Sequence, residues 1–370
     1  MTDEKLSGID LIMALDNKIR NVRTSSFDIS FGELANKYRE KELIIQPDFQ
    51  RLFRWSEAKQ SRFIESLLLE LPIPPFFLIE NDDGTLELID GLQRISSYLH
   101  FIGTLQESNL ILNECDIIPE FNGLSYKELP TALQLKLKNR YVRLEIVRKG
   151  SDSRLRYYMF KRLNTGGANL SEQEIRNSII RILDDKFNKF LINLSENKDF
   201  QICISTITED KRLERYDQEL VLRFFSFKNN KKIFRHDIAD FMTEYMESVS
   251  DPDRGDISFD YLREESIFKK TFSILKETLG EYAFSRVNER GTYVLGFIVY
   301  HYEAFTLGIQ KHLHNIDLSN EEQMQKIKRE LNLIKRDEKF RQITTGGGKN
   351  TKKYLDERIS IVEERVGNVI

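Results

Sequence analysis

Cysteine is scarce in this chain of 370 residues, which contains only Cys115 and Cys203. The two cysteines lie far apart and lack the spacing of a zinc site or of a disulfide framework. Sparse cysteines suit a reducing compartment, so we expect a cytoplasmic protein. The N-terminus has no apolar signal region, and the longest apolar run, around residues 294–300, is interrupted by Gly296. The sequence therefore predicts no membrane span and no membrane partner.

An excess of basic charge is absent too, since 56 Lys and Arg stand against 59 Asp and Glu and the net charge is −3. A chain with this balance has no global positive field, so any contact with nucleic acid must come from a local patch. Hydrophobic residues make up 40% of the chain and aromatic residues 11%, which argues against disorder. The length and this composition allow two domains with real cores.

Recognisable catalytic patterns are missing as well, and no Ser-His-Asp or Cys-His arrangement is suggested. The Gly346–Lys349 run invites comparison with a P-loop, but position 343 is isoleucine where the motif needs glycine, and no strand is expected before it. We interpret the run as a flexible connector, with Asn350 or Thr351 capping the last helix. None of the five histidines begins a His-Asn-His nuclease pattern: His100, His236, His301, His312 and His314.

The first half of the chain mixes strand and helix signals. Residues 1–40 favour a helical lead-in, and Ser56 stands where a helix N-cap is expected. Behind Ser56, an apolar stripe at helical spacing comprises Phe63, Ile64, Leu67, Leu68 and Leu71. Strands are expected at 42–46, 76–80, 85–89 and 141–147, with an Asn-Asp-Asp-Gly turn between the second and third, and helices at 92–102 and 153–163.

Beyond Ser171 the pattern changes, because nearly every segment has helical periodicity. This change places a domain boundary within residues 165–200. We predict an α+β protein in which an α/β domain, residues 1–180, is followed by a mainly α-helical domain, residues 181–370. The expected helices in the second part span 171–195, 217–228, 236–249, 259–280, 292–311, 321–336 and 351–366.

Three polar motifs and a proline-rich segment in the first half carry a family resemblance. Residues 44–55 read Ile-Ile-Gln-Pro-Asp-Phe-Gln-Arg-Leu-Phe-Arg-Trp, and residues 71–75 read Leu-Pro-Ile-Pro-Pro ahead of Asp-Gly-Leu-Gln-Arg at 90–94. Residues 162–177 carry an Asn-Thr-Gly, Leu-Ser and Glu pattern. Their order and spacing resemble the N-terminal domain of GmrSD-type restriction endonucleases, also called domain-of-unknown-function family 262. The resemblance implies a ParB/sulfiredoxin-like fold, here in a stand-alone form without a C-terminal His-Asn-His nuclease domain.

The Asp90–Arg94 pentapeptide closes a predicted strand and opens a predicted helix, and two readings of it stay open. Asp90 can cap the helix, with Gln93 completing a capping-box exchange. Alternatively, the helix N-terminus binds phosphate, because its N–H groups and its dipole attract anions. In that reading Gly91 lets the backbone approach the ligand, and the Arg94 guanidinium donates paired hydrogen bonds to two oxygens. Gln93 then orients a water or a phosphate oxygen, and Asp90 reaches a metal or a ribose hydroxyl.

The resemblance implies a nucleotide pocket that all three motifs line. Its usual pentapeptide is Asp-Gly-Gln-Gln-Arg, so Leu92 departs from it at the first Gln, and no role is carried over to that position. In ParB-like proteins the asparagine that matches Asn164 touches phosphate or Mg²⁺. The implied catalytic residues are Asp90, Gln93 and Arg94. The implied nucleotide-binding residues are Gln50, Arg51, Gly91, Arg94, Asn164, Thr165 and Gly166, and the implied Mg²⁺ ligands are Asp90 and Asn164.

Structural readings stand beside these functional ones. Trp55, the only tryptophan, can be a base-stacking wall, but a core role is favoured. In the third motif, Gly166 and Gly167 suit a helix C-cap and Ser171 a following N-cap. Its residues Glu174 and Arg176 are expected to brace the segment.

Residues 211–235 interleave basic and aromatic side chains, a composition that can indicate a nucleic-acid surface. A core-facing aromatic stripe with a solvated basic face is the favoured interpretation. Within this region, the turn from Lys228 to Lys232 is the part best suited to contact DNA.

The combined reading is a nucleotide-binding protein, able to hydrolyse a nucleoside triphosphate slowly with Mg²⁺, that serves as a sensor or regulatory component of a prokaryotic anti-phage or restriction-type system. A separate nuclease or effector protein is the expected partner, and DNA or a second copy of the chain are further candidate partners. Two alternatives stay open: a DNA nuclease that uses the Asp90 pocket itself, and a non-catalytic DNA-binding or antitoxin-like module.

Overall fold

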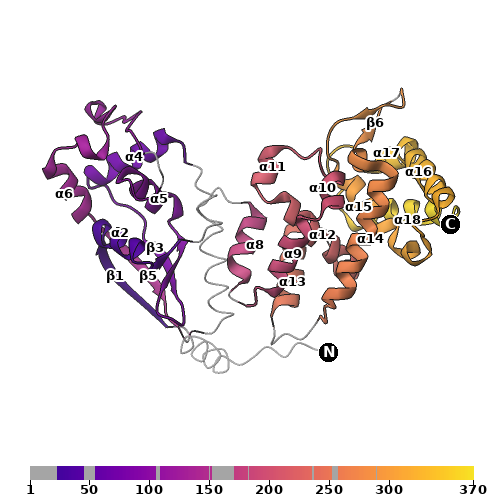
Figure 1. Cartoon of the computed structure of the whole chain (residues 1–370), viewed down its shortest axis with the longest axis horizontal. Coiled ribbons are helices and arrows are strands. Elements are labelled where there is room, and N and C mark those ends of the chain that lie inside the picture. Colours follow the sequence, from indigo (N-terminus) through magenta and orange to yellow (C-terminus); the bar gives the residue numbers. More distant parts are fainter. Residues whose placement is uncertain are drawn as a thin grey trace, which may run out of the picture. The chain divides into compact units, whose positions relative to one another are not determined.

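A computed structural model of the chain divides into two compact units, Met1–Gly167 and Ala168–Ile370, which we describe one at a time. Figure 1 draws the first unit in indigo and magenta and the second in colours from magenta to yellow. The residues that the structure describes are 23–45, 55–105, 109–149, 151, 171–181, 183–235, 237–251, 257–288 and 290–370.

The first unit contains a five-stranded mixed sheet with the order β1-β5-β3-β4-β2. Strand β1 pairs antiparallel with β5, β5 pairs parallel with β3, β3 pairs antiparallel with β4, and β4 pairs parallel with β2. The elements are β1 (Thr24–Ser30), α2 (Phe31–Arg39), β2 (Leu43–Ile44), α4 (Glu57–Leu68), β3 (Phe76–Glu80), β4 (Leu86–Asp90), α5 (Leu92–Phe101), α6 (Thr131–Asn139) and β5 (Tyr141–Val147), with 3₁₀ turns at Pro119–Phe121 and Tyr126–Glu128.

Helices cover one side of this sheet in Figure 1, and the burial along β5 follows from that layering. Val142, Leu144 and Ile146 are buried, whereas Tyr141 and Arg143 between them are exposed. Alternation of this kind is typical of a strand with one face on the core and one face toward solvent. The first unit is therefore a two-layer α/β domain, as predicted.

Local signals placed several elements of this unit correctly. The Ser56 hydroxyl accepts a hydrogen bond from the Lys59 N–H at 3.3 Å and caps α4, and β3 and β4 form the predicted hairpin. Helix α4 ends at Leu68, so Leu71 does not belong to the helical stripe and is 41% exposed. Leu71 opens a segment in which each proline disfavours the α conformation of the residue before it.

The helical lead-in predicted for residues 1–40 is confirmed at Phe31–Arg39, which is a helix, and wrong at Thr24–Ser30, which is a strand. Of the strand residues, only Ile29 is buried. Pairing with β5, more than a hundred residues later, defines this strand, so no local apolar pattern revealed it. The predicted helix at 153–163 lies outside the described residues.

The second unit is mainly helical, as predicted, but its elements depart from the predicted spans at several places. Residues 292–298 were expected in a helix, but Arg286–Val287 and Tyr293–Val294 pair as a short antiparallel hairpin, β6–β7. Residues 171–195 form two helices rather than one. The helices are α8 (Glu172–Ile180), α9 (Lys186–Ser195), α10 (Lys198–Cys203), α11 (Glu209–Leu213), α12 (Tyr216–Asn230), α13 (Ile238–Ser250), α14 (Tyr261–Leu279), α15 (Val299–Gly308), α16 (Glu321–Arg336), α17 (Glu338–Thr344) and α18 (Lys352–Gly367), with 3₁₀ turns at Lys231–Ile233, Gly280–Tyr282 and Gln310–Asn315.

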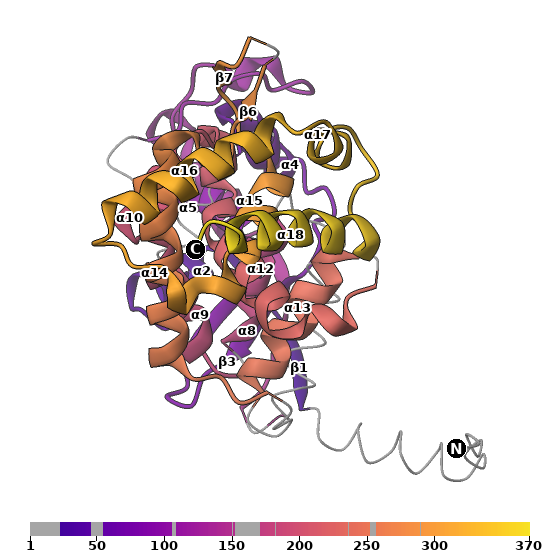
Figure 2. The ribbon, with the colours of Figure 1, turned by 90° about the vertical axis from the view of Figure 1, so that its right-hand side faces the viewer.

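Helix α15 lies at the centre of this unit, and Figure 2 shows α14, α16 and α18 around it. Eight of its ten residues are buried, including the carboxylate of Glu303. Glu303 pairs with Arg223 of α12 at 2.7 Å and with Arg358 of α18 at 2.8 Å. Each buried charge thus has an opposite charge beside it, which offsets part of its desolvation cost.

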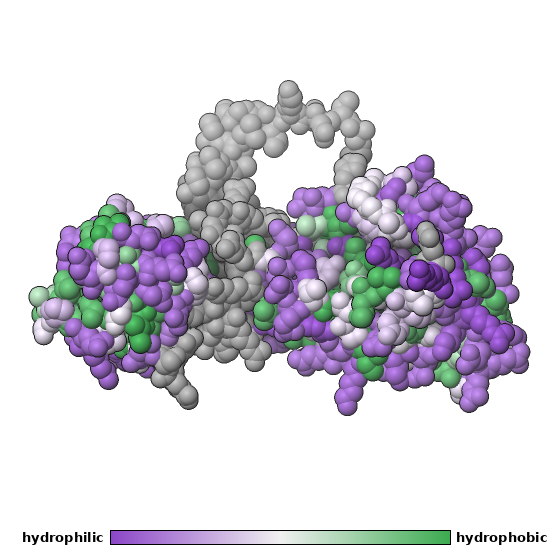
Figure 3. Space-filling model, turned by 90° about the horizontal axis from the view of Figure 1, so that it is seen from above, coloured by the Kyte–Doolittle hydropathy of each residue, from purple (hydrophilic) through white to green (hydrophobic). Residues whose placement is uncertain are grey.

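Figure 3 shows hydrophilic residues over most of the viewed surface, with hydrophobic patches between them. Exposed large apolar residues such as Leu262 and Leu295 occur, and single exposed apolar side chains are common in folded proteins. Among the described residues, no helix combines the length and the apolar character that crossing a membrane requires.

Candidate functional site

The junction of β4 and α5 is the candidate site, and its local geometry differs from the predicted capping box. Asp90 is the last residue of β4, and the N-cap position of α5 belongs to Gly91. The Asp90 carboxylate pairs with the Arg94 guanidinium at 3.1 Å, one helical turn further on. The side-chain amide oxygen of Gln93, Oε1, accepts a hydrogen bond from the backbone N–H of Trp55 at 3.1 Å. The capping-box reading of Asp90 and Gln93 is therefore wrong.

Gly91 is required here on two grounds. Its φ of +107° is a backbone conformation that residues with a Cβ rarely adopt. A Cβ at this position would also come within 2.4 Å of the Phe76 ring. This glycine lets the chain leave the sheet and begin a helix directly above a core aromatic ring.

Arg94 turns inward and holds the proline-rich segment. Its guanidinium donates hydrogen bonds to the backbone carbonyls of Pro74 and Pro75, the second at 3.2 Å, and lies 4.8 Å above the centre of the Phe76 ring. Only 12% of the side chain is exposed. Burial lowers the pKa of the guanidinium, and the Asp90 charge opposes that shift, so it stays charged. The guanidinium therefore faces the proline segment and the Phe76 ring rather than solvent.

Gln93 belongs to a second set of contacts, around the backbone of Trp55. Gln60 donates to the Trp55 carbonyl at 2.8 Å, and His100 Nδ1 lies 2.8 Å from the Gln60 side-chain oxygen. The Trp55 ring is half-buried and packs edge-on against Phe63 at 5.9 Å, which agrees with the favoured core role. Gln93 thus fixes the end of the first motif through its side-chain oxygen.

Asp90 is the side chain of the pentapeptide best placed to meet a ligand. One third of it is exposed, and only one of its two carboxylate oxygens is engaged by Arg94. A Mg²⁺ ion commonly binds through one or two carboxylates together with substrate phosphates and waters, so the second oxygen fits such an ion. In the described part of the chain, no group of three or more His, Cys, Asp or Glu side chains could hold a metal by itself.

The structure therefore brings Asp90, Gly91, Gln93 and Arg94 together at one junction. The remaining candidates lie outside the described residues: Gln50, Arg51, Asn164, Thr165 and Gly166. Their place beside the junction stays a prediction from the family resemblance.

Residues 31–181 match the family model described as GmrSD restriction endonuclease, N-terminal domain. This segment belongs to the GmrSD N-terminal domain family. The family points to a role in a restriction-type defence system. Searches of curated proteins and of solved structures gave no match.

The GmrSD N-terminal segment ends in α8, and the contacts around this helix confirm the predicted cap. The Ser171 hydroxyl accepts from the Glu174 N–H at 3.2 Å, while the Glu174 carboxylate accepts from the Ser171 N–H at 2.8 Å. The Ser171 hydroxyl also donates to the carbonyl of Glu214 at 2.6 Å. These contacts fix the start of α8 within the third motif.

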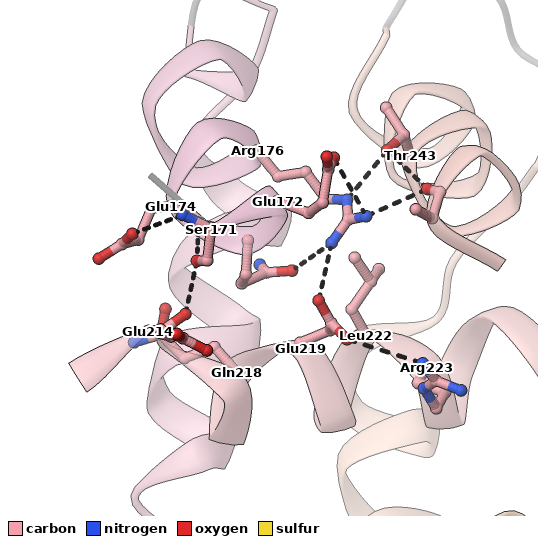
Figure 4. Close-up of polar contacts among 12 residues, drawn as sticks. Ser171, Glu172, Glu174, Arg176, Glu214, Gln218, Glu219, Leu222, Arg223 and Thr243 are labelled. Atoms are coloured by element: carbon pink, nitrogen blue, oxygen red, sulfur yellow. Dashed lines mark hydrogen bonds and ion pairs between the residues drawn. The ribbon is translucent and has the colours of Figure 1, made fainter. Parts of the chain in front are cut away.

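Arg176 then ties α8 to α12 and α13 of the same unit, as Figure 4 shows. Its guanidinium is almost fully buried and donates to the Thr243 hydroxyl at 2.9 Å and to the Ala239 carbonyl at 3.1 Å, both on α13. It also pairs with Glu219 of α12 at 3.4 Å. The GmrSD match thus reaches beyond the first compact unit and includes a helix anchored in the second.

The aromatic residues of 211–235 form core, as favoured from the sequence, since Phe224, Phe225, Phe227 and Phe234 are buried. The basic turn after them is largely engaged within the protein. Lys228 pairs with Glu264 at 2.8 Å, and Lys231 pairs with Asp356 at 3.0 Å. The carbonyl of Lys232 accepts from Lys352 at 2.8 Å. The two ion pairs offset the charges of Lys228 and Lys231, whereas the bond to the Lys232 carbonyl brings the ammonium of Lys352 to the turn.

Proposed function

We propose that the GmrSD-type segment binds a nucleoside triphosphate at the β4–α5 junction. The protein then acts as a nucleotide sensor or regulatory component of a restriction-type defence system. Support comes from the family match, which points to such a system, and from the shape of the junction itself. A separate nuclease or effector protein is the partner in this proposal, and DNA or a second copy of the chain are further candidates.

The observation that carries the proposal is the start of α5. Its N-cap is a glycine with no side chain to cap the helix, and in the described residues no side-chain acceptor bonds the N–H groups of Leu92 or Arg94. Amides in the first turn of a helix have no partner in a preceding turn, and the helix dipole makes this end positive. Phosphate oxygens suit such a helix start.

Asp90 supplies the second element, a partly exposed carboxylate beside those amides. In the proposal, Asp90 and Asn164 hold the Mg²⁺ ion, which neutralises phosphate charge when bound. Gln50, Arg51, Thr165 and Gly166 contact the nucleotide.

Gln93 and Arg94 act as positioning residues in this proposal. Gln93 holds the first motif through Trp55, and Arg94 holds the proline segment beside the helix start. Slow hydrolysis would rest on positioning and charge neutralisation by these groups.

In this proposal, the third motif links nucleotide binding to the helical unit and so to the effector. Residues 164–166 lie a few residues before Ser171, and α8 is bonded to α12 and α13 through Arg176. A nucleotide that contacts Asn164 would therefore act on a segment tied to the helical unit. In the proposal this segment passes the binding event to the surface that the effector contacts.

A thermal-unfolding panel of nucleoside triphosphates, with and without Mg²⁺, tests the proposal. Because a ligand of the native state stabilises it by mass action, at least one triphosphate should raise the melting temperature of the wild type. Asp90→Asn should reduce the Mg²⁺-dependent part of the rise. Asp82→Asn, in the exposed β3–β4 turn, is the matched control and should behave like the wild type.

The proposal fails if no triphosphate at millimolar concentration shifts the melting temperature. Efficient Mg²⁺-dependent cleavage of DNA by the purified protein, lost in Asp90→Asn, would favour the nuclease alternative instead.

A further inference from the structure

A cavity of about 240 Å³ lies in the helical unit, far along the sequence from the proposed nucleotide site. It is lined by the β6–β7 hairpin and by helices α15, α16 and α17, which lie near one another in Figures 1 and 2. Its polar lining comprises Arg286, His301, Lys335, Arg341, Thr344 and Thr345, together with Asn288. None of these residues belongs to the GmrSD match.

Lys335 is the unusual member of this lining, because only 1% of this charged residue is exposed to solvent. Its ammonium donates to the backbone carbonyls of Tyr282 and Ser285, the second at 3.0 Å, and lies over the rings of Tyr293 and Phe305 at 5.2 and 5.6 Å. No carboxylate among the described residues pairs with it. Burial lowers the pKa of Lys335 to about 7, as expected for an ammonium without a counter-charge.

The other charges at the cavity have the same sign. Arg286 and Arg341 are exposed, and neither guanidinium forms a hydrogen bond or an ion pair with a described residue. Aspartate and glutamate are absent from the described lining. His301 adds no charge near neutral pH, because burial and the nearby Lys335 lower its pKa to about 3. Three basic side chains thus line one cavity, and its described lining holds no acidic side chain.

We propose that this cavity binds a small phosphate-bearing anion. Guanidinium groups match phosphate oxygens with paired hydrogen bonds, and a lysine adds a compact charge. The exposed Thr345 hydroxyl is a further donor at the rim. The volume is below that of pockets for drug-sized ligands, roughly 300–1,000 Å³, so the ligand is inorganic phosphate or the phosphate end of a mononucleotide. The bound anion supplies the counter-charge that Lys335 lacks.

Calorimetric titration of the full chain with inorganic phosphate and, separately, with adenosine monophosphate tests this site, using chloride at equal ionic strength as the blank. The wild type should bind at least one of the two saturably. Arg341→Gln should weaken that binding roughly tenfold, because it removes one charge-assisted contact. Lys339→Gln removes an equal charge from the same helix outside the cavity, and should bind like the wild type.

Asp90→Asn separates this site from the proposed nucleotide site, because the Arg341-dependent binding should persist in that variant. Tighter binding of the mononucleotide than of phosphate would show that the attached nucleoside contributes, and similar binding would show that phosphate suffices. The proposal is overturned if neither compound binds saturably. It is also overturned if Arg341→Gln and Lys339→Gln both bind like the wild type.

Discussion

Replacing Arg94 with alanine should destabilise the protein as well as disturb its site. The change removes two hydrogen bonds to the Pro74 and Pro75 carbonyls, the ion pair with Asp90 and the contact with the Phe76 ring. Because the guanidinium is 12% exposed while Asp90 remains one-third exposed, the carboxylate left behind can be partly hydrated. We expect a loss of about 2–4 kcal/mol in the free energy of unfolding.

For a unit of this size that loss corresponds to a fall of roughly 5–15 °C in melting temperature. The assay is denaturant-induced and thermal unfolding of the full chain, with Arg143→Ala as the matched control. Arg143 is 53% exposed and forms only surface ion pairs, with Asp28 and Glu145, so its loss should cost at most about 1 kcal/mol. Arg94→Lys keeps the positive charge but loses the planar guanidinium that bonds two carbonyls at once. It should therefore recover only part of the stability that Arg94→Ala loses.

Nucleotide binding then has to be measured at a temperature where each variant is folded. If Arg94→Ala unfolds at the same denaturant concentration as the wild type, the guanidinium does not hold the proline segment, and the structural role assigned here is wrong.

Three further predictions concern other contacts. Gly91→Ala should cost roughly 2–4 kcal/mol because of its positive φ and the Phe76 ring, whereas Gly84→Ala, also at positive φ but in open space, should cost less by denaturant unfolding. Arg176→Met should cost about 2–4 kcal/mol in the same assay, since it removes the buried guanidinium that bonds Thr243, the Ala239 carbonyl and Glu219. A change below about 0.5 kcal/mol would contradict the anchoring of α8. Folding lowers the pKa of Lys335 to about 7, so between about pH 7 and pH 10 only the unfolded chain keeps the proton. The free energy of unfolding of the wild type, minus that of Lys335→Met, should therefore be constant below about pH 7. Above that pH the difference should rise by at most about 1.4 kcal/mol per pH unit, up to about pH 10. A difference independent of pH would refute the buried-ammonium account.

Much of the fold around the site could be predicted because its signals are local. Ser56 marks the start of α4, and the Asn-Asp-Asp-Gly turn marks the β3–β4 hairpin. Strand β1 escaped prediction because its partner lies on β5, and sequence periodicity does not report a pairing so distant in the chain. The β6–β7 hairpin was missed for a similar reason, since each of its strands has only two residues.

The strand-to-helix junction of the candidate site was predicted from the sequence, but the orientation of its side chains was not. The pentapeptide 90–94 does fall at a strand-to-helix junction, as the alternation of patterns indicated. The inward turn of Arg94 depends on carbonyls some twenty residues earlier, which reach it only when β3 lies beside β4. One signal was available, since prolines donate no N–H and leave their segment's carbonyls in need of a donor from elsewhere.

The cavity at Lys335 had no sequence signal. Its lining residues are spread from position 286 to 345 and form no motif. Lys335 stands in the last turn of α16, where a lysine is expected to face solvent and complement the helix dipole. Only the packing of α16 against its neighbours shows that this lysine is buried.

Hydrogen–deuterium exchange of the full chain, with and without a nucleoside triphosphate and Mg²⁺, tests the central claim most directly, because it locates the ligand on the backbone. The account predicts slower exchange in peptides that contain the start of α5, residues 91–95, and in peptides from 46–54 and 162–170. Asp90→Asn should lose that protection. Protection confined to peptides of the helical unit, or none at saturating nucleotide, would contradict a nucleotide site at the β4–α5 junction.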